Sequence, residues 1–346
     1  MSRHAFAAVA AITTAATLLG CDGSRDDDRR VVLYSSVDRV YMDEVIIPAI
    51  EAQTGLDVVY VGDNEINKTT GLVLRVESEM DEPVADVWWS SEPFGTIRLA
   101  GAGALEAYAF SGQDAVWPER LSGENDLWRG FAQRARVIAF SESRVGESDA
   151  PRTLAELTDE RWRGRVGIAR PEFGTTRGHM GALLDRWGAD TLAGWLRDLD
   201  DNGVRIYSGN ADVVRAIAAG EIDVGLTDTD DVWAARRNGS PVGLVYEAVD
   251  PTADPESFGP LLMPNTVALV RGGPNPEAAA LLIDWITSAE CERLLAESDS
   301  RNIPAHAALA GRYPDLVVPD PAEVDFAAVA ARIDEAMELV GEHLDR

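Results

Sequence analysis

The feature that most constrains the fold is a regular alternation of strand-like and helix-like segments. Apolar runs such as VVLYSS (31–36), LDVVYVG (56–62) and ADVWWSS (85–91) are separated by segments with helical spacing of apolar residues. This alternation predicts a mostly parallel sheet covered by helices on both faces. Ligands bind such sheets beyond the carboxyl ends of the strands, so we look for a site in the loops there.

The alternation restarts in the second half of the chain, which indicates two lobes. A long strand-like run, GFAQRARVIAFS (130–141), opens the second unit, and PNTVALVRG (264–272) is expected to return to the first. The length of 346 residues fits this division, because a single hydrophobic core usually stops growing at roughly 250–300 residues.

The N-terminus is typical of a secreted lipoprotein. Arg3 precedes the apolar stretch from Ala5 to Leu19, which is too short for a comfortable membrane span. The stretch ends in LLGC (18–21), which resembles a bacterial lipobox, so we expect cleavage before Cys21 and lipidation of Cys21. Cys291, the other cysteine, is then without a disulfide partner and is expected in the core.

These observations predict the domain boundaries. The predicted segments are a signal peptide (1–20), a lipidated tether (21–30), lobe 1 (30–133 plus about 255–290), lobe 2 (134–250) and C-terminal helices (291–346).

The charge of the chain excludes some partners. With 31 Lys and Arg against 59 Asp and Glu, the formal net charge is -28. This argues against nucleic acid, because phosphate contacts need basic residues. It also argues against adhesion to anionic membranes, so we expect membrane attachment only through the lipid. We further expect the protein to be a monomer. The acidity itself serves solubility, or suits a salty habitat.

Three acids stand directly after the apolar run IDVGL (222–226), namely Asp228, Asp230 and Asp231. One interpretation is structural, because acids near a helix N-terminus interact favourably with its dipole. The other is ligand contact, since carboxylate-only sites suit hard cations such as calcium, magnesium, manganese or ferric iron. Without a counter-ion, converging carboxylates would raise one another's pKa values.

A second set of polar residues suits an anion. Thr175 and Thr176 stand at a predicted helix start, where backbone N–H groups and hydroxyls can hold a negative group. Ser208 and Asn210 follow another strand, and Asn210 is also a candidate helix cap. If these groups and the aspartates face one cleft, a zwitterion such as an aminophosphonate would fit, as would a metal held with an accompanying anion.

The order of several segments resembles a known family. The segments are VVLYSS, IEAQTGLDVVYV, ADVWWSSE, GFAQRARVIAFS, AIAAGEIDVGLTDTDD and MPNTVALVRGGPNPEAA. Together they resemble the type II periplasmic substrate-binding proteins of ABC transporters, in particular the ferric-iron-binding branch. The resemblance implies an α/β fold of two lobes, each a mostly parallel sheet flanked by helices, with the ligand cleft between them and a transporter permease as partner.

The resemblance also implies a metal site. The family's ligand positions fall on Asp38, Glu92, Asp230 and Asp231. The last two replace a tyrosine pair that is the hallmark of the branch, so carboxylate oxygen stands here where the relatives use phenolate. Asp38 and Glu92 have an alternative role, because each precedes a predicted helix and could cap it.

The sequence therefore predicts a lipid-anchored, extracytoplasmic solute-binding protein that captures an iron-like metal cation by lobe closure. The alternative ligand is a small organic zwitterion or anion, such as an aminophosphonate or a phosphorylated compound. No resident cofactor is required, and a bound metal ion would be cargo. A metal-dependent hydrolase is the third reading, but no catalytic motif supports it, and 4 histidines leave little for a histidine-rich centre.

Overall fold

The computed structural model describes residues 29–37, 39–63, 70–110, 117–248 and 258–344. The predicted signal peptide (1–20), Cys21, most of the tether and Asp38 lie outside these residues. Among the helices of the described part, none combines the length and the apolar character needed to cross a lipid bilayer.

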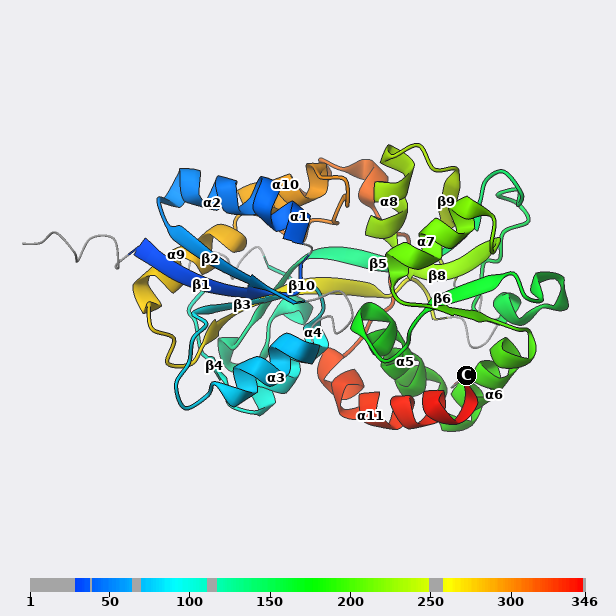
Figure 1. The fold of residues 1–346 in the computed structure, drawn as a ribbon, viewed down its shortest axis with the longest axis horizontal. Coiled ribbons are helices and arrows are strands. Elements are labelled where there is room, and N and C mark those ends of the chain that lie inside the picture. Colours follow the sequence, from blue (N-terminus) through cyan, green and yellow to red (C-terminus); the bar gives the residue numbers. More distant parts are fainter. Residues whose placement is uncertain (1–28, 38, 64–69, 111–116, 249–257, 345–346) are drawn as a thin grey trace, which may run out of the picture.

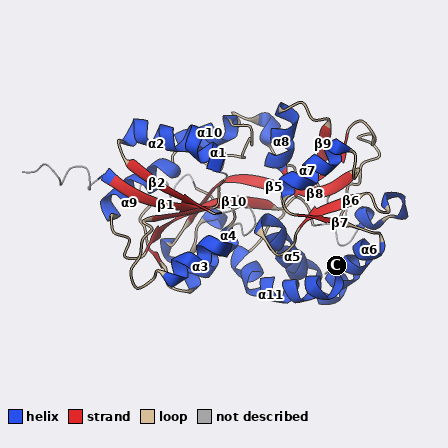
Figure 2. Cartoon of the chain, in the orientation of Figure 1, coloured by secondary structure: helices blue, strands red, loops and turns tan. Residues whose placement is uncertain are grey.

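The first lobe is built on three parallel strands, in the order β2-β1-β3. All but the first residue of β1 is buried, because helices cover both faces of the sheet (Figures 1 and 2). The strands are β1 (Arg30–Ser35), β2 (Asp57–Gly62) and β3 (Val87–Ser90), with the short β4 (Leu105–Glu106) at the edge. The helical segments are α1 (Arg39–Tyr41), a π-helical turn (Met42–Ile46), α2 (Ile47–Thr54), α3 (Thr70–Ser78), α4 (Pro93–Gly101), α9 (Pro276–Ile286) and α10 (Ala289–Glu297).

The second lobe has its own parallel group, in the order β8-β6-β7. Its strands are β6 (Val166–Ala169), β7 (Arg205–Tyr207) and β8 (Val224–Asp228), and β9 (Val242–Val245) pairs with β5. Its helices are α5 (Gly174–Trp187), α6 (Ala189–Asp201), α7 (Asn210–Ala219), α8 (Thr229–Arg237) and α11 (Phe326–His343).

Two antiparallel strands join the lobes. They are β5 (Arg129–Ser141) and β10 (Leu262–Val270), and Figure 1 shows them running from one lobe into the other. β10 pairs with β3 of the first lobe and β5 pairs with β8 of the second, so one continuous sheet passes through the molecule. This arrangement confirms the predicted fold of two α/β lobes.

The last helices pack on different lobes. Cys291 of α10 is fully buried in a core that also holds Trp89 and Phe131, as expected for a cysteine without a disulfide partner. α11 instead packs against α5 and α6 of the second lobe, and its first residue, Phe326, touches Phe94 of α4 with ring centroids 6.0 Å apart.

The segment LAELTDERWRG (154–164) has a helical pattern of residues, but it does not form a continuous helix. Residues 154–164 form two 3-10 turns, at Ala155–Thr158 and Glu160–Trp162, separated by the extended residue Asp159. The reason is a side chain distant in sequence: Asn202 donates to the carbonyls of Leu157 and Asp159, at 3.2 and 3.1 Å. These carbonyls are thereby fixed outside the pattern of an α-helix.

Candidate ligand-binding site

A cleft of about 730 Å³ lies between the lobes, where the carboxyl ends of the parallel strands face each other. Its first wall includes Ser36 and Ser91, which directly follow β1 and β3. The opposite wall comes from residues that end or follow β6, β7 and β8 and from the linking strands. The polar residues of this wall include Arg134, Thr175, Thr176, Ser208, Asn210, Asp228, Asp230, Asp231 and Asn265.

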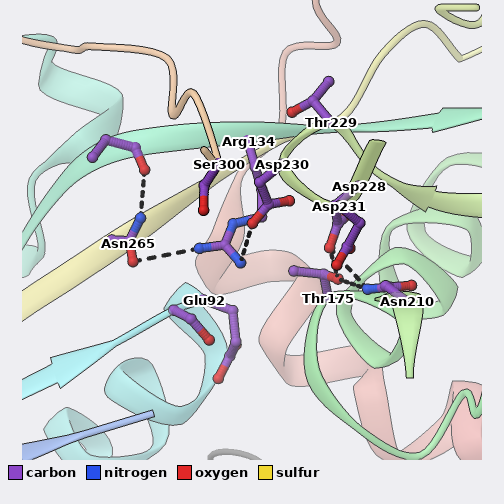
Figure 3. A network of polar contacts seen from close by, with 12 residues as sticks. Glu92, Arg134, Thr175, Asn210, Asp228, Thr229, Asp230, Asp231, Asn265 and Ser300 are labelled. Carbon is purple, nitrogen blue, oxygen red and sulfur yellow. Dashed lines mark hydrogen bonds and ion pairs between the residues drawn. The ribbon is translucent and has the colours of Figure 1, made fainter. Parts of the chain in front are cut away.

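Asp228 is the last residue of β8, and its carboxylate is deeply buried. Arg136 is its neighbour across the sheet, on β5, and the Arg136 Nη1 lies 2.9 Å from the Asp228 Oδ1. Both side chains are only 2% exposed. The hydroxyl of Thr175 and the amide of Asn210 also donate to the Asp228 Oδ2, the amide at 2.9 Å (Figure 3). Asp228 occupies the N-cap position of α8, yet its side chain makes no capping hydrogen bond.

Asp230 and Asp231 lie in the first turn of α8, nearer to the cleft. The Arg134 Nη1 is 3.2 Å from the Asp230 Oδ2, with side chains 14% and 16% exposed. The Thr227 hydroxyl donates to the Asp231 Oδ2 at 3.3 Å. Burial alone would lower the pKa of Arg134, but the charges of Asp230, Asp228 and Asp231 outweigh it and raise that pKa.

One oxygen from each of the three aspartates lies within 4.8 Å of the others, so the cluster could hold a metal ion. The three aspartates do not lack counter-ions, because two arginines of β5 form ion pairs with Asp230 and Asp228. Three carboxylates beside two guanidiniums leave one net negative charge. The two guanidiniums offset much of the repulsion among the three carboxylates.

The residues predicted to hold an anion have partners in the same network. The Asn210 amide donates to the Thr175 hydroxyl at 2.9 Å, and the Thr176 hydroxyl donates to the Asn210 Oδ1 at 3.3 Å. Asn210 does not cap its helix, since Gly209 stands at the N-cap and Asn210 is the first helical residue. The hydroxyl of Ser208 donates to Asp212 at the rim of the cleft.

Glu92 is not part of the aspartate cluster. It is the N-cap of α4 and accepts hydrogen bonds from the N–H groups of Phe94 and Gly95, at 2.6 and 3.1 Å. Burial raises its pKa, although these two hydrogen bonds oppose the shift. Glu92 borders a second hollow of about 720 Å³ between α4, α5 and α11. In the structure Glu92 therefore caps α4, which is the alternative role considered from the sequence. It is not among the acids that lie close enough together to share a metal ion.

His179 lies behind the cluster on α5. It is buried, and the Arg136 Nε lies 3.4 Å from the His179 Nδ1. Burial and the positive charge of Arg136 hold the pKa of His179 well below its usual value, so the ring is neutral. It accepts a hydrogen bond from Arg136 and is buried on α5, away from the cleft lining.

Asn265 was missed by the sequence reasoning. Its Oδ1 accepts from the Trp89 indole at 3.2 Å and lies 3.5 Å from the Arg134 Nη2 (Figure 3). The available signal was the spacing of Arg134 and Arg136 on one strand, which places both side chains on the same face. Two arginines on one face need hydrogen-bond acceptors, and the partner strand β10 provides one in Asn265.

Comparisons with known proteins show which family the chain resembles. Residues 95–324 match the family described as "Bacterial extracellular solute-binding protein". The chain is 26% identical over 254 residues to "Iron uptake protein A2" of Synechocystis sp., covering 70% of this chain and 73% of the relative. It is 25% identical over 172 residues to the "Fe(3+)-binding periplasmic protein" of Serratia marcescens, covering 49% and 48% of the two chains.

Solved structures share the fold. Iron-bound HitA from Pseudomonas aeruginosa superposes with a TM-score of 0.78 at 24% identity, covering 91% of this chain and 99% of the other. The ferric binding protein from Campylobacter jejuni superposes with a TM-score of 0.80 at 17% identity, covering 91% and 100%. With the family match extending over more than half of its length, this chain belongs to the bacterial extracellular solute-binding proteins.

Proposed function

We propose that the protein is the solute-binding component of an ABC importer and that its cargo is a hard metal cation, iron-like in its preference for oxygen. The observation that carries the proposal is the position of the aspartate cluster in the cleft between the lobes. Relatives named for iron uptake and for Fe(3+) binding support the same class of cargo. Family membership favours binding over hydrolysis.

The ligands to the cargo are proposed to be Asp230 and Asp231, with Asp228 behind them. Asp230 and Asp231 are partly exposed to the cleft, whereas Asp228 is held by Arg136, Thr175 and Asn210. Two carboxylates and the remaining oxygen donors of the cleft suit a hard cation. Asp38, which lies outside the described residues, stays a candidate for a fourth carboxylate from the family resemblance.

Capture would proceed by closure of the lobes. β5 and β10 are the only strands of the described part that run between the two parallel groups, so bending within them would rotate one lobe against the other. A ligand that touches both walls of the cleft stabilises the closed form and shifts the population toward it. The permease of the importer would then bind the closed form.

A second candidate cargo is a small organic zwitterion or anion, and the arginines favour it. Arg134 lines the cleft beside the aspartates, and the start of α5 presents Thr175 and Thr176 there. A cleft of this size can enclose a drug-sized molecule, since ligand pockets usually measure about 300–1,000 Å³. Such a molecule would carry an amine toward the aspartates and an acidic group toward Arg134.

The anchor completes the proposal. Lipidation at Cys21 would hold the protein at the extracytoplasmic face of a membrane, with residues 22–30 as a short tether. The protein would then diffuse in the plane of the membrane that contains its permease.

The test is native mass spectrometry of residues 22–346 purified from cells, followed by titration calorimetry with Mn²⁺ and with ferric nitrilotriacetate. A bound metal ion, or binding of either probe with a stoichiometry of about one, supports the metal cargo. A bound organic mass without metal, together with no heat from either probe, favours the second candidate.

A further inference from the structure

We propose that Arg134 is a built-in cation that competes with the cargo for the carboxylate of Asp230. The inference rests on the proposed function, because it assumes a cationic cargo at Asp230 and Asp231. It adds a residue that sets how tightly, and for which cations, the site binds.

The first support is the difference between the two arginines of β5. Arg136 and Asp228 are both 2% exposed, and Arg136 has further contacts with Thr175 and Asn210. Arg134 and Asp230 are 14% and 16% exposed and both line the cleft. One pair therefore belongs to the interior of the lobe, and the other lies on the surface that a ligand reaches.

The second support is the alternative partner of Arg134. The Arg134 Nη1 lies 3.2 Å from the Asp230 Oδ2, while its Nη2 lies 3.5 Å from the Asn265 Oδ1 (Figure 3). Asn265 is fixed by its own bond to the carbonyl of Ala132. Because Asn265 is neutral and held in place, Arg134 can leave Asp230 and keep a hydrogen-bond acceptor.

The backbone explains why Arg134 reaches the cleft. Arg134 pairs with Met263 of β10, and the register between β5 and β10 shifts between Met263 and Asn265. Such bulges bend a strand and redirect its side chains, and they are common beside binding sites. Here the shift lies in the linking strands, so lobe rotation would act directly on the contact between Arg134 and Asn265.

The consequence is a bias among cations. A metal ion bound to the Asp230 Oδ2 must displace a guanidinium that already occupies one side of that oxygen. A multivalent ion has a larger Coulomb attraction to the two carboxylates than the singly charged Arg134 has. A monovalent amine has no such advantage over Arg134. Arg134 would thus lower the affinity for all cations and leave multivalent ones with the advantage.

The test is titration calorimetry of residues 22–346 with MnCl₂, comparing wild type with Arg134→Gln, Arg134→Lys and Arg236→Gln. We expect Arg134→Gln to bind Mn²⁺ about tenfold tighter or more, because one positive charge beside the ion is lost. Arg134→Lys keeps the charge and should stay within about threefold of wild type. Arg236→Gln is the matched control, since Arg236 lies on α8, the helix that carries Asp230, but pairs with Glu142 outside the cleft.

Each outcome of the titrations either supports or overturns the role of Arg134. Equal or weaker Mn²⁺ binding by Arg134→Gln, in a wild type that binds Mn²⁺, overturns the role of Arg134 and leaves the proposed function standing. Binding by Arg134→Gln alone supports the competition. Failure of both proteins to bind Mn²⁺ and ferric nitrilotriacetate overturns the proposed function and the inference together. If Arg134→Gln does not fold, Arg134→Met is titrated instead, and a larger Mn²⁺-induced rise in Tm than in wild type is the supporting result.

Discussion

Arg136 and Asp228 face each other across β5 and β8 and form an ion pair within the second lobe, with Nη1 and Oδ1 2.9 Å apart. A buried charge without a counter-ion is unfavourable in free energy. The two side chains therefore hold each other in place. Asp228 then holds Thr175 and Asn210, which belong to two different helices. The pair therefore organises the wall of the cleft on which the candidate ligands lie.

Arg136→Met should lower the free energy of unfolding by about 3–5 kcal/mol, because it leaves the Asp228 carboxylate buried without its counter-ion. Urea unfolding at neutral pH measures the change. The double variant Arg136→Met, Asp228→Leu should recover part of the loss, since neither buried charge remains. A single variant as stable as wild type would contradict the account of this pair.

His179 should make stability depend on pH below its ordinary pKa of about 6.5. Its pKa is lowered in the folded protein by burial and by Arg136, so the unfolded chain takes up a proton that the folded protein does not. The contribution of His179 is therefore complete above about pH 6.5 and is lost as the pH falls below it, by up to about 1.4 kcal/mol per pH unit.

The measurement is urea unfolding of wild type and His179→Gln between pH 7.5 and 5.0. The wild type should lose stability more steeply than the variant as the pH falls, because glutamine has no proton to take up. Parallel curves for the two proteins would exclude His179 as the cause.

The alternating apolar runs predicted two α/β units because they leave few other arrangements, and the family resemblance implied the cleft between them. The sequence left open whether the aspartates share a cleft with Thr175 and Asn210, and the structure brings all of them to the same one. The sequence could not predict how they divide their contacts. Whether an acid caps a helix, as Glu92 does, or binds an arginine, as Asp228 does, depends on side chains brought close only by folding.

Cys21→Ser should release the protein from the membrane fraction, because the lipid is proposed as its only attachment. Fractionation of cells that express the full-length chain, with immunodetection of each fraction, checks this. The matched control is Cys291→Ser, which removes the cysteine of the core and leaves the lipobox intact. A Cys21→Ser protein that stays with membranes would contradict the anchor.

Ferric iron bound at this site should give no tyrosinate-to-iron absorption in the visible range. The family resemblance implies that Asp230 and Asp231 replace the tyrosine pair of the ferric branch, and carboxylates provide no such band. Tyr41 lines the cleft, but its hydroxyl donates to the carbonyl of Leu294 at 3.1 Å, and burial raises its pKa, which disfavours a phenolate. A visible spectrum of the protein titrated with ferric nitrilotriacetate tests this, and Tyr41→Phe identifies the source of any band that appears.

Asp230→Asn with Asp231→Asn should weaken binding of Mn²⁺ or ferric nitrilotriacetate by about tenfold or more. A contact to a charged group contributes roughly 1.5–3 kcal/mol, so the loss of even one such contact suffices for this change. The free energy of unfolding should change by about 1 kcal/mol or less, because the pair of Asp230 with Arg134 is partly exposed. Asp299→Asn, which alters an exposed pair with Arg237, is the control for the loss of a surface charge. Calorimetry and urea unfolding on the same samples separate the two roles of the aspartates: normal binding with a clear loss of stability would mean that they serve the helix and not the cargo.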